Sequence, residues 1–305
     1  MVKKLSCKES IIYVFDKANK PALTIDSGDM LEVESYDCFE NQIDENNSFE
    51  GVDWNRINPA TGPVYVNGAQ PGDVLKVVIE RIEVADYGVM VTGAGIGVMG
   101  DRLTGMTQKL VRIENEQVIF DDKLRLPLNK MIGVIGVAPA GDAVPTGTPG
   151  AHGGNMDTKL IAEGSTLYLP VMVEGALLAL GDLHAAMGDG EVSGAGVEMA
   201  GKVTIKVNVL KKGALPYAIK QPAIETDEAM VFIASEKTLD EAVKQSAVYA
   251  VEYVSKVTGL SLEEVTILMS AAGNAHISQV VDPLMTARFS VPKFVLKVYG
   301  VEQFL

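Results

Sequence analysis

The hydrophobic segments of residues 1–210 are short, and this limits the chain to a small set of folds. They are brief runs rich in valine and isoleucine, and in residues 203–209 such residues occupy every second position. Strict alternation places these side chains on one face of an extended strand. Turn-forming sequences such as Asn67-Gly68 and Pro71-Gly72-Asp73 separate the runs. The first two thirds of the chain are therefore predicted to be mostly β.

The pattern changes to a helical one after Pro222. Residues 238–241 form a capping box, and hydrophobic residues then recur at helical spacing until Gly259. Residues 261–264 form a second capping box, which predicts a helix through Ala272. Two capped helices in tandem predict a helical hairpin packed against a sheet.

Together these patterns predict a mainly β fold with sheets arranged as a sandwich or barrel, a C-terminal helical hairpin, and an α+β class overall. We expect residues 1–215 to form the mostly β region that carries the candidate site. Residues 216–305 are expected to form an α+β region with the two capped helices, packed on the same core.

Composition excludes several classes of partner. Lysine and arginine number 26 against 40 aspartate and glutamate, a net charge of -14, which repels phosphate backbones and anionic lipids. We therefore expect no nucleic-acid or membrane partner. The N-terminal segment has no signal-peptide hydrophobic stretch, and Cys7 and Cys38 are too few for a disulfide framework. A cytoplasmic location is expected.

Glycine is abundant, at 30 of 305 residues, and one glycine run imitates a nucleotide-binding motif. Residues 95–100 match the pattern G-x-G-x-x-G. That motif requires a helix to begin at the glycines, whereas residues 111–120 have the pattern of a hairpin. We interpret the run as a glycine-rich β loop.

A D-x-H sequence, formed by Asp182 and His184, follows a hydrophobic run that ends at Leu180. Asp182 and His184 are two positions apart, so an extended chain places them on the same face, where an oxygen and a nitrogen ligand suit a divalent metal such as zinc. Glu191 follows after glycines and is a candidate general acid or base. A solvated acidic turn with a surface histidine remains the alternative for this stretch.

A second histidine opens the sequence His152-Gly-Gly-Asn-Met-Asp157. Gly153 and Gly154 permit close approach of a ligand to the backbone, and Asn155 and Asp157 offer an amide and a carboxylate. We count these four residues as candidate substrate-binding groups and His152 as a candidate catalytic residue. A glycine turn closed by an Asx hydrogen bond is the structural alternative.

These residues lie in longer stretches that resemble the acetamidase/formamidase family of amide hydrolases. The matching stretches are residues 35–43, 58–73, 152–157 and, most distinctively, 175–191. The resemblance implies a mostly β, homo-oligomeric enzyme, a dimer or higher, that hydrolyses short amides to a carboxylate and ammonia with a bound divalent metal. Zinc is the expected metal and calcium an alternative.

The resemblance also implies roles for individual residues. Asp37, Asp182 and His184 correspond to metal ligands, His152 to a further candidate ligand, and Glu191 to the acid/base. In this hypothesis the backbone N–H groups of residues 153–154 stabilise the oxyanion. Asn67 and Gln70 stand where many members have acidic residues, and this bears on the substrate range.

Two alternatives remain open on the sequence alone. The thiol of Cys38 is a candidate nucleophile for the same reaction, although a lone cysteine in a hydrophobic run is usually a small buried residue. The other alternative is a non-catalytic module that binds cations or a small molecule at its acidic groups.

Overall fold

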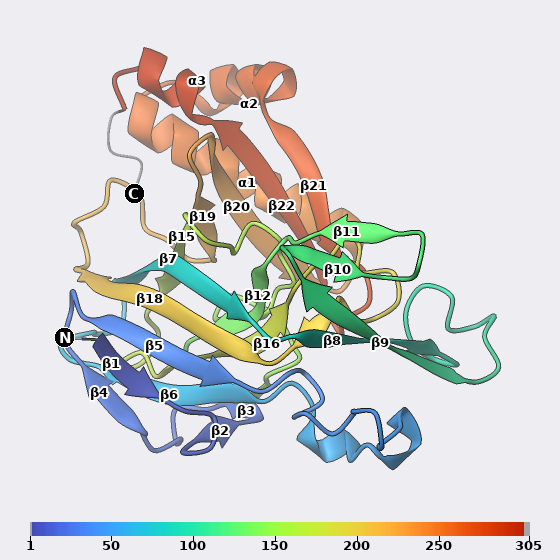
Figure 1. The fold of residues 1–305 in the computed structure, drawn as a ribbon. Helices are drawn as coiled ribbons and strands as arrows, with labels where there is room; N and C mark the ends of the chain where they lie inside the picture. Colours follow the sequence, from blue (N-terminus) through green and yellow to red (C-terminus); the bar gives the residue numbers. More distant parts are fainter. Residues whose placement is uncertain (1, 302–305) are drawn as a thin grey trace.

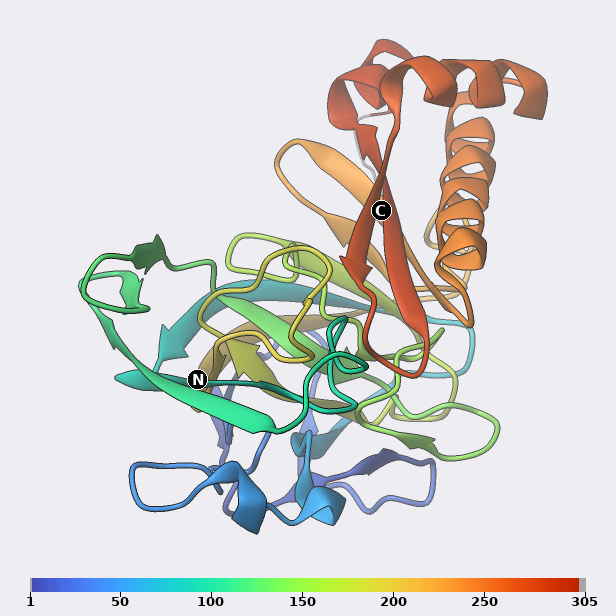
Figure 2. The same cartoon turned by 90° about the vertical axis from the view of Figure 1, so that its right-hand side faces the viewer.

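The computed structural model describes residues 2–301, and one of its two large sheets has nine strands that come from both ends of the chain. Figures 1 and 2 show this sheet crossing the molecule from the N-terminal strands to the C-terminal hairpin. Its order is β1 (Val2–Leu5), β5 (Met30–Ser35), β18 (Gly201–Leu210), β7 (Val74–Val84), β15 (Thr166–Pro170), β19 (Ala223–Glu225), β20 (Ala229–Glu236), β22 (Met285–Pro292) and β21 (Asn274–Gln279).

The second sheet is irregular and carries most of the site described below. Its main order is β11 (Arg125–Pro127), β10 (Gln117–Ile119), β9 (Met106–Glu114), β8 (Tyr87–Gly93), β17 (Glu198–Met199), β16 (Leu178–His184), β12 (Met131–Gly136) and β14 (Gly153–Asn155). Strand β6 (Ala60–Val66) pairs with β16, β2 (Ile11–Ile12) and β4 (Leu23–Ile25). A small third sheet pairs β13 (Val144–Pro145) with β3 (Val14–Phe15).

The main core lies between the two large sheets. Alternation in β18 buries Val203, Ile205 and Val207 completely, as the sequence pattern predicts. They belong to one hydrophobic cluster with Ile132 of β12 and Leu183 of β16, which are also fully buried. Side chains from two sheets thus share one core, which is the arrangement of a sandwich.

The helices are α1 (Leu239–Thr258), α2 (Leu262–Ala272) and α3 (Lys293–Val298), and they gather at one end of the molecule in Figures 1 and 2. The hydroxyls of Thr238 and Ser261 cap α1 and α2, and Gly259 ends α1 with a left-handed φ of 76°. The side chains of Tyr253 and Phe232 lie in a second core between the helices and the sheet. The predicted mainly β fold with a C-terminal helical hairpin is confirmed.

The glycine-rich segment and the last histidine of the chain both lie outside helices. The glycine run at residues 95–100 lies in the connection between β8 and β9, and no helix begins there, so its interpretation as a β loop is confirmed. His276 lies on β21, apart from the candidate site residues, and its Nε2 is 3.2 Å from Ser290 Oγ.

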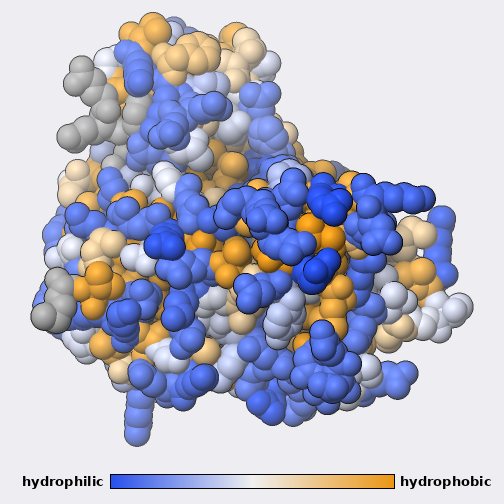
Figure 3. Space-filling model, in the orientation of Figure 1, coloured by the Kyte–Doolittle hydropathy of each residue, from blue (hydrophilic) through white to orange (hydrophobic). Residues whose placement is uncertain are grey.

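Hydrophilic side chains dominate the face shown in Figure 3, with smaller hydrophobic areas between them. No helix in residues 2–301 has both the length and the hydrophobicity needed to cross a membrane. Two short 3-10 helices, η1 (Phe49–Gly51) and η2 (Trp54–Arg56), lie in the long connection between β5 and β6.

Candidate active site

Strand β16 ends in the two residues of the D-x-H sequence, and the structure brings them together. His184 Nε2 lies 3.3 Å from Asp182 Oδ1, 3.2 Å from Glu198 Oε2 and 3.7 Å from Asp157 Oδ1. Glu198 reaches this point because β16 and β17 are antiparallel and His184 pairs directly with Glu198. All four side chains are buried. One imidazole nitrogen is therefore surrounded by three carboxylates.

Backbone conformation distinguishes three of the acidic residues near this histidine. Asp157, Asp182 and Glu191 have φ values of 37°, 53° and 48°, in a region that non-glycine residues rarely occupy. Such conformations cost about 1–3 kcal/mol each and persist where surrounding structure enforces them, commonly at functional sites. Their coincidence on the site's acids indicates that the fold holds these carboxylates in place against local preference.

Two glycines provide the space that this arrangement needs. A Cβ atom on Gly133 of β12 would lie 2.5 Å from Asp157 Oδ1 and 2.6 Å from Asp182 Oδ2. A Cβ atom on Gly196 would lie 2.6 Å from His184 Nδ1. The carboxylates and the imidazole therefore fill volume that any larger residue would occupy.

Burial and mutual repulsion control the protonation of these acids. Desolvation is the largest cause that raises the pKa of Asp157 to about 7 and that of Glu198 to about 8, and the charge of Asp182 adds to both. Burial alone would lower the pKa of His184, but the charges of Glu198 and Asp182 outweigh it and raise that pKa well above its usual value. The pKa of Asp182 is lowered, since His184 more than offsets desolvation.

Several buried polar atoms of the site have no hydrogen-bond partner. They include both carboxylate oxygens of Asp157, Oε2 of Glu198 and Nδ1 of His184. Buried carboxylates without donors are costly unless a cation or proton compensates them. Asp157, His184 and Glu191 form one group with ligand atoms within 4.8 Å of one another, and Cys38, Asp182 and Glu198 form a second. The residues present thus fit a divalent metal.

Glu191 is held at the site by the C-terminal hairpin. The N–H of Gly190 donates to the carbonyl of Ser278, at 2.8 Å. Arg288 on β22 donates to Asp189 Oδ2 at 2.8 Å and to the carbonyl of Ile277 at 2.6 Å, and it is 3% exposed. Burial and the charge of Asp157 raise the pKa of Glu191 well above its usual value.

The same hairpin supplies an acid that sequence reasoning missed. Asp282, in the turn between β21 and β22, accepts a hydrogen bond from Asn155 Nδ2 at 3.1 Å. Burial, and then the charge of Asp157, raises the pKa of Asp282 well above its usual value. Its position follows from sheet pairing far along the chain, and the local sequence Val-Val-Asp-Pro gives no signal for it.

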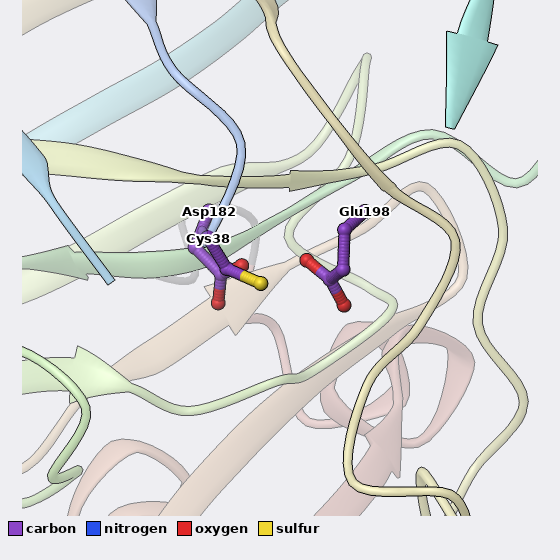
Figure 4. A group of neighbouring side chains, drawn as sticks. All are labelled: Cys38, Asp182 and Glu198. Carbon is purple, nitrogen blue, oxygen red and sulfur yellow. The ribbon is translucent and has the colours of Figure 1, made fainter. Parts of the chain in front are cut away.

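The loop after β5 places Asp37 and Cys38 differently from each other. Asp37 Oδ1 accepts hydrogen bonds from the N–H groups of Phe39 and Asn41, at 3.0 and 2.6 Å, so this carboxylate closes its own loop. The loop lies beside the acids of the site, which we call the acid cluster: Asp157, Asp182, Glu191, Glu198 and Asp282. Burial raises its pKa to about 6. Figure 4 shows the thiol of Cys38 and the carboxylates of Asp182 and Glu198 turned toward one another. Burial, then the charge of Glu198, raises the pKa of Cys38 well above its usual value, which disfavours a thiolate nucleophile.

The His152 segment forms a tight turn at the edge of the second sheet. The ring of His152 packs edge-on against Phe15 with centroids 5.1 Å apart, and burial lowers its pKa to about 4. The N–H of Gly153 donates to the carbonyl of Gly150, and Gly154 pairs with Ile135 of β12. Both glycines therefore serve the turn and the sheet.

A cavity of about 680 Å³ opens at the acid cluster. Asp182, Glu191, Glu198, Asp282 and Asn155 contribute polar groups to it. Since Asn155 Oδ1 has no partner, it is an acceptor available to a ligand. The cavity thus combines buried carboxylates, a metal-compatible cluster and a free acceptor in one place.

One family model matches residues 15–146 and 140–298 of this chain. The match, the fold and the site together define an amidohydrolase, an enzyme that hydrolyses amide C–N bonds. The chain belongs to the acetamidase/formamidase family.

Solved structures and one further relative are similar to this chain. The chain is similar to a predicted acetamidase/formamidase from the thermophile Thermoanaerobacter tengcongensis, with 54% identity, 99% of each chain covered and a TM-score of 0.95. It is also similar to an acetamidase from Bacillus halodurans, at 48% identity with 98% of this chain and 100% of that chain covered, and a TM-score of 0.94. A formamidase from Methylophilus methylotrophus is 28% identical, covering 84% of this chain and 81% of that protein.

Proposed function

We propose that this chain hydrolyses short-chain primary amides of the formamide and acetamide type to a carboxylate and ammonia, with the aid of one divalent metal. The observation that carries the proposal is the set of buried carboxylates around His184, several of whose oxygens accept no hydrogen bond. This set lies beside a cavity in a member of the family. An amide is a poor electrophile, so the site must polarise its carbonyl, activate water and protonate the leaving nitrogen.

The residues that would hold the metal are His184, Asp182, Asp157 and Glu198, from two strands and one loop. Nitrogen and carboxylate donors in this combination favour zinc over calcium, which prefers six to eight oxygens. When bound, the metal supplies Lewis-acid polarisation and lowers the pKa of water. Asp37 is the third ligand implied by the family resemblance. Its Oδ1 accepts two N–H groups of its own loop, so we propose that it holds this loop in place rather than binding the metal.

Glu191 is the proposed proton carrier. It lines the cavity and is 7% exposed, and a raised pKa brings a carboxylate nearer to the pH at which it can both accept and donate a proton. It accepts the proton of the attacking water and passes that proton to the amide nitrogen, which leaves as ammonia. Asn155 Oδ1 accepts a hydrogen bond from the substrate N–H₂ group and so orients it.

An ammonia-release assay with formamide and acetamide tests the proposal. Glu191→Gln preserves size and removes proton transfer, and we expect kcat to fall by about 10²–10⁴-fold with zinc content unchanged. Glu174→Gln makes the same chemical change on an exposed carboxylate and is the matched control. Chelation is expected to abolish turnover, and zinc to restore it better than calcium. Full activity of Glu191→Gln, or of metal-free protein, would refute the mechanism.

We further propose that the protein is a cytoplasmic homo-oligomer in which residues 1–215 and 216–305 pack on a common core. Both cysteines are free and buried, which suits a reducing compartment. Ile267 of α2 and Phe294 and Val298 of α3 are 73%, 66% and 78% exposed, and such residues often lie at interfaces between subunits. Light scattering on the purified protein measures the oligomeric state.

A further inference from the structure

The cavity at the acid cluster is much larger than the substrates for which the family is named. Its volume is about 680 Å³. Cavities of roughly 300–1,000 Å³ accommodate ligands of drug size, whereas acetamide has only four non-hydrogen atoms. Most of the cavity would therefore stay unfilled around an acetamide molecule whose carbonyl lies at the carboxylates.

Hydrophobic side chains form one part of the cavity wall beyond the acids, and polar residues such as Asn58 and Thr146 form another. Phe39, Val91, Ile57 and Ile96 line the hydrophobic part, and they belong to a small hydrophobic cluster that is separate from the main core. Ile57 and Ile96 are only partly buried by protein atoms. One side of this wall therefore packs against other hydrophobic residues, and the other side leaves hydrophobic surface exposed to the cavity.

An aromatic residue extends this wall outward. Trp54 of η2 lines the cavity, is 49% exposed and packs edge-on against Phe49, with ring centroids 4.9 Å apart. Pro145, Val281 and Pro283 line the cavity from other parts of the chain. Figure 2 shows the β21–β22 turn, which carries the last two, reaching down from the helical end toward the loops of the β part. Apolar surface is thus contributed by several separate segments.

The lining offers no cationic side chain to an anionic substituent. Its ionisable acids are Asp182, Glu191, Glu198 and Asp282, and no lysine, arginine or histidine is among the cavity-lining residues that the structure describes. Arg56 lies next in sequence to a lining residue, but its guanidinium is paired with Glu40, with Nε 2.9 Å from Oε2.

We propose that the preferred substrate is a primary amide with an uncharged, hydrophobic acyl group larger than acetyl, such as a four- to six-carbon chain or a phenylacetyl group. The inference rests on the proposed amide hydrolysis. The carbonyl lies at the acid cluster, and the acyl group covers Ile57, Ile96 and Trp54. Each methylene that leaves water for this wall raises kcat/KM about fourfold until the wall is covered.

The test compares kcat/KM for formamide, acetamide, butyramide, hexanamide and phenylacetamide, all by ammonia release. Values are expected to rise along the series, and glutaramate, an anion of similar length, is expected to be at least about tenfold poorer than pentanamide. A steady fall from formamide to hexanamide, or equal rates for glutaramate and pentanamide, would refute the acyl-group proposal alone. Ammonia from none of the amides would refute the proposed function itself.

Substitutions in the wall provide a second measurement. Ile96→Ala and Trp54→Ala are expected to lower the ratio of kcat/KM for hexanamide to kcat/KM for formamide by at least about fivefold. Trp54 is half-exposed, so its removal leaves no buried cavity that would unfold the protein. Leu124→Ala, in the exposed turn between β10 and β11, is the matched control and keeps the ratio. An unchanged ratio in both wall variants would overturn the assignment.

Discussion

Replacing Gly133 by alanine probes how tightly the fold positions the acid cluster. The added Cβ would lie 2.5 Å from Asp157 Oδ1 and 2.6 Å from Asp182 Oδ2, where ordinary contact begins at 3.4 Å. Each carboxylate must therefore move by nearly 1 Å. Displacements of this size in a catalytic site cost about 10²-fold in rate, so we expect kcat/KM to fall by about that factor.

The effect on stability is expected to be smaller than the effect on catalysis. Overpacking one methyl group costs about 1–3 kcal/mol, and in a protein of this size that lowers Tm by only a few degrees. Ammonia release, zinc content by mass spectrometry and calorimetry measure the three consequences. Gly141→Ala is the control, since its Cβ meets no atom within 4 Å. A Gly133→Ala enzyme with wild-type kcat/KM and full zinc content would refute the reasoning.

The other predictions concern protonation and the C-terminal hairpin. In chelator-treated protein, the free energy of unfolding of Glu198→Gln is expected to exceed that of wild type by an amount that grows as the pH rises from about 4.5 to 8. Burial raises the pKa of Glu198 in the folded protein to about 8, whereas the unfolded chain releases this proton near pH 4.5. Urea titrations measure the two free energies, and a difference that does not change with pH would contradict the prediction. As the pH falls from 6.5 to 4, wild type loses up to about 3 kcal/mol relative to His152→Gln, since burial lowers the native pKa of His152 to about 4 and the unfolded chain takes up the proton first. If the difference in free energy of unfolding between wild type and His152→Gln did not change with pH, this prediction would be wrong. Arg288→Ala is expected to lower the free energy of unfolding by about 3 kcal/mol and to reduce kcat, because its guanidinium anchors Asp189 and the loop of Glu191. Arg288→Lys should recover part of both, and wild-type values for Arg288→Ala would exclude an anchoring role.

Local sequence patterns predict the parts of the structure that depend on neighbours in the chain. The capping boxes at Thr238 and Ser261 locate the starts of two helices, and alternation in residues 203–209 identifies a buried strand face. The D-x-H spacing predicts that Asp182 and His184 lie together, and their side chains do meet, although the positive φ of Asp182 departs from the extended chain on which that prediction rests. These features need no knowledge of which strands pair.

The remaining site residues are brought in by pairing between distant segments. Glu198 reaches His184 through the register of β16 and β17, and Asp282 arrives on a hairpin of the other large sheet. The positive φ values of Asp157 and Asp182 are a further limit, because local preference opposes them and only the assembled fold imposes them. Register and imposed backbone conformation are properties of the whole fold, so a single sequence gives no direct signal for them.

The contribution of the β21–β22 hairpin to the acid cluster sets an order of events during synthesis. Domains begin to fold as they emerge from the ribosome at about 5–20 residues per second, so several seconds separate the appearance of Glu198 from that of Asp282 and Arg288. During that interval the nascent chain holds most of its carboxylates but has neither the partner of Asn155 nor the anchor of the Glu191 loop. Under the proposed mechanism, amide hydrolysis therefore requires that the hairpin has been translated and has docked.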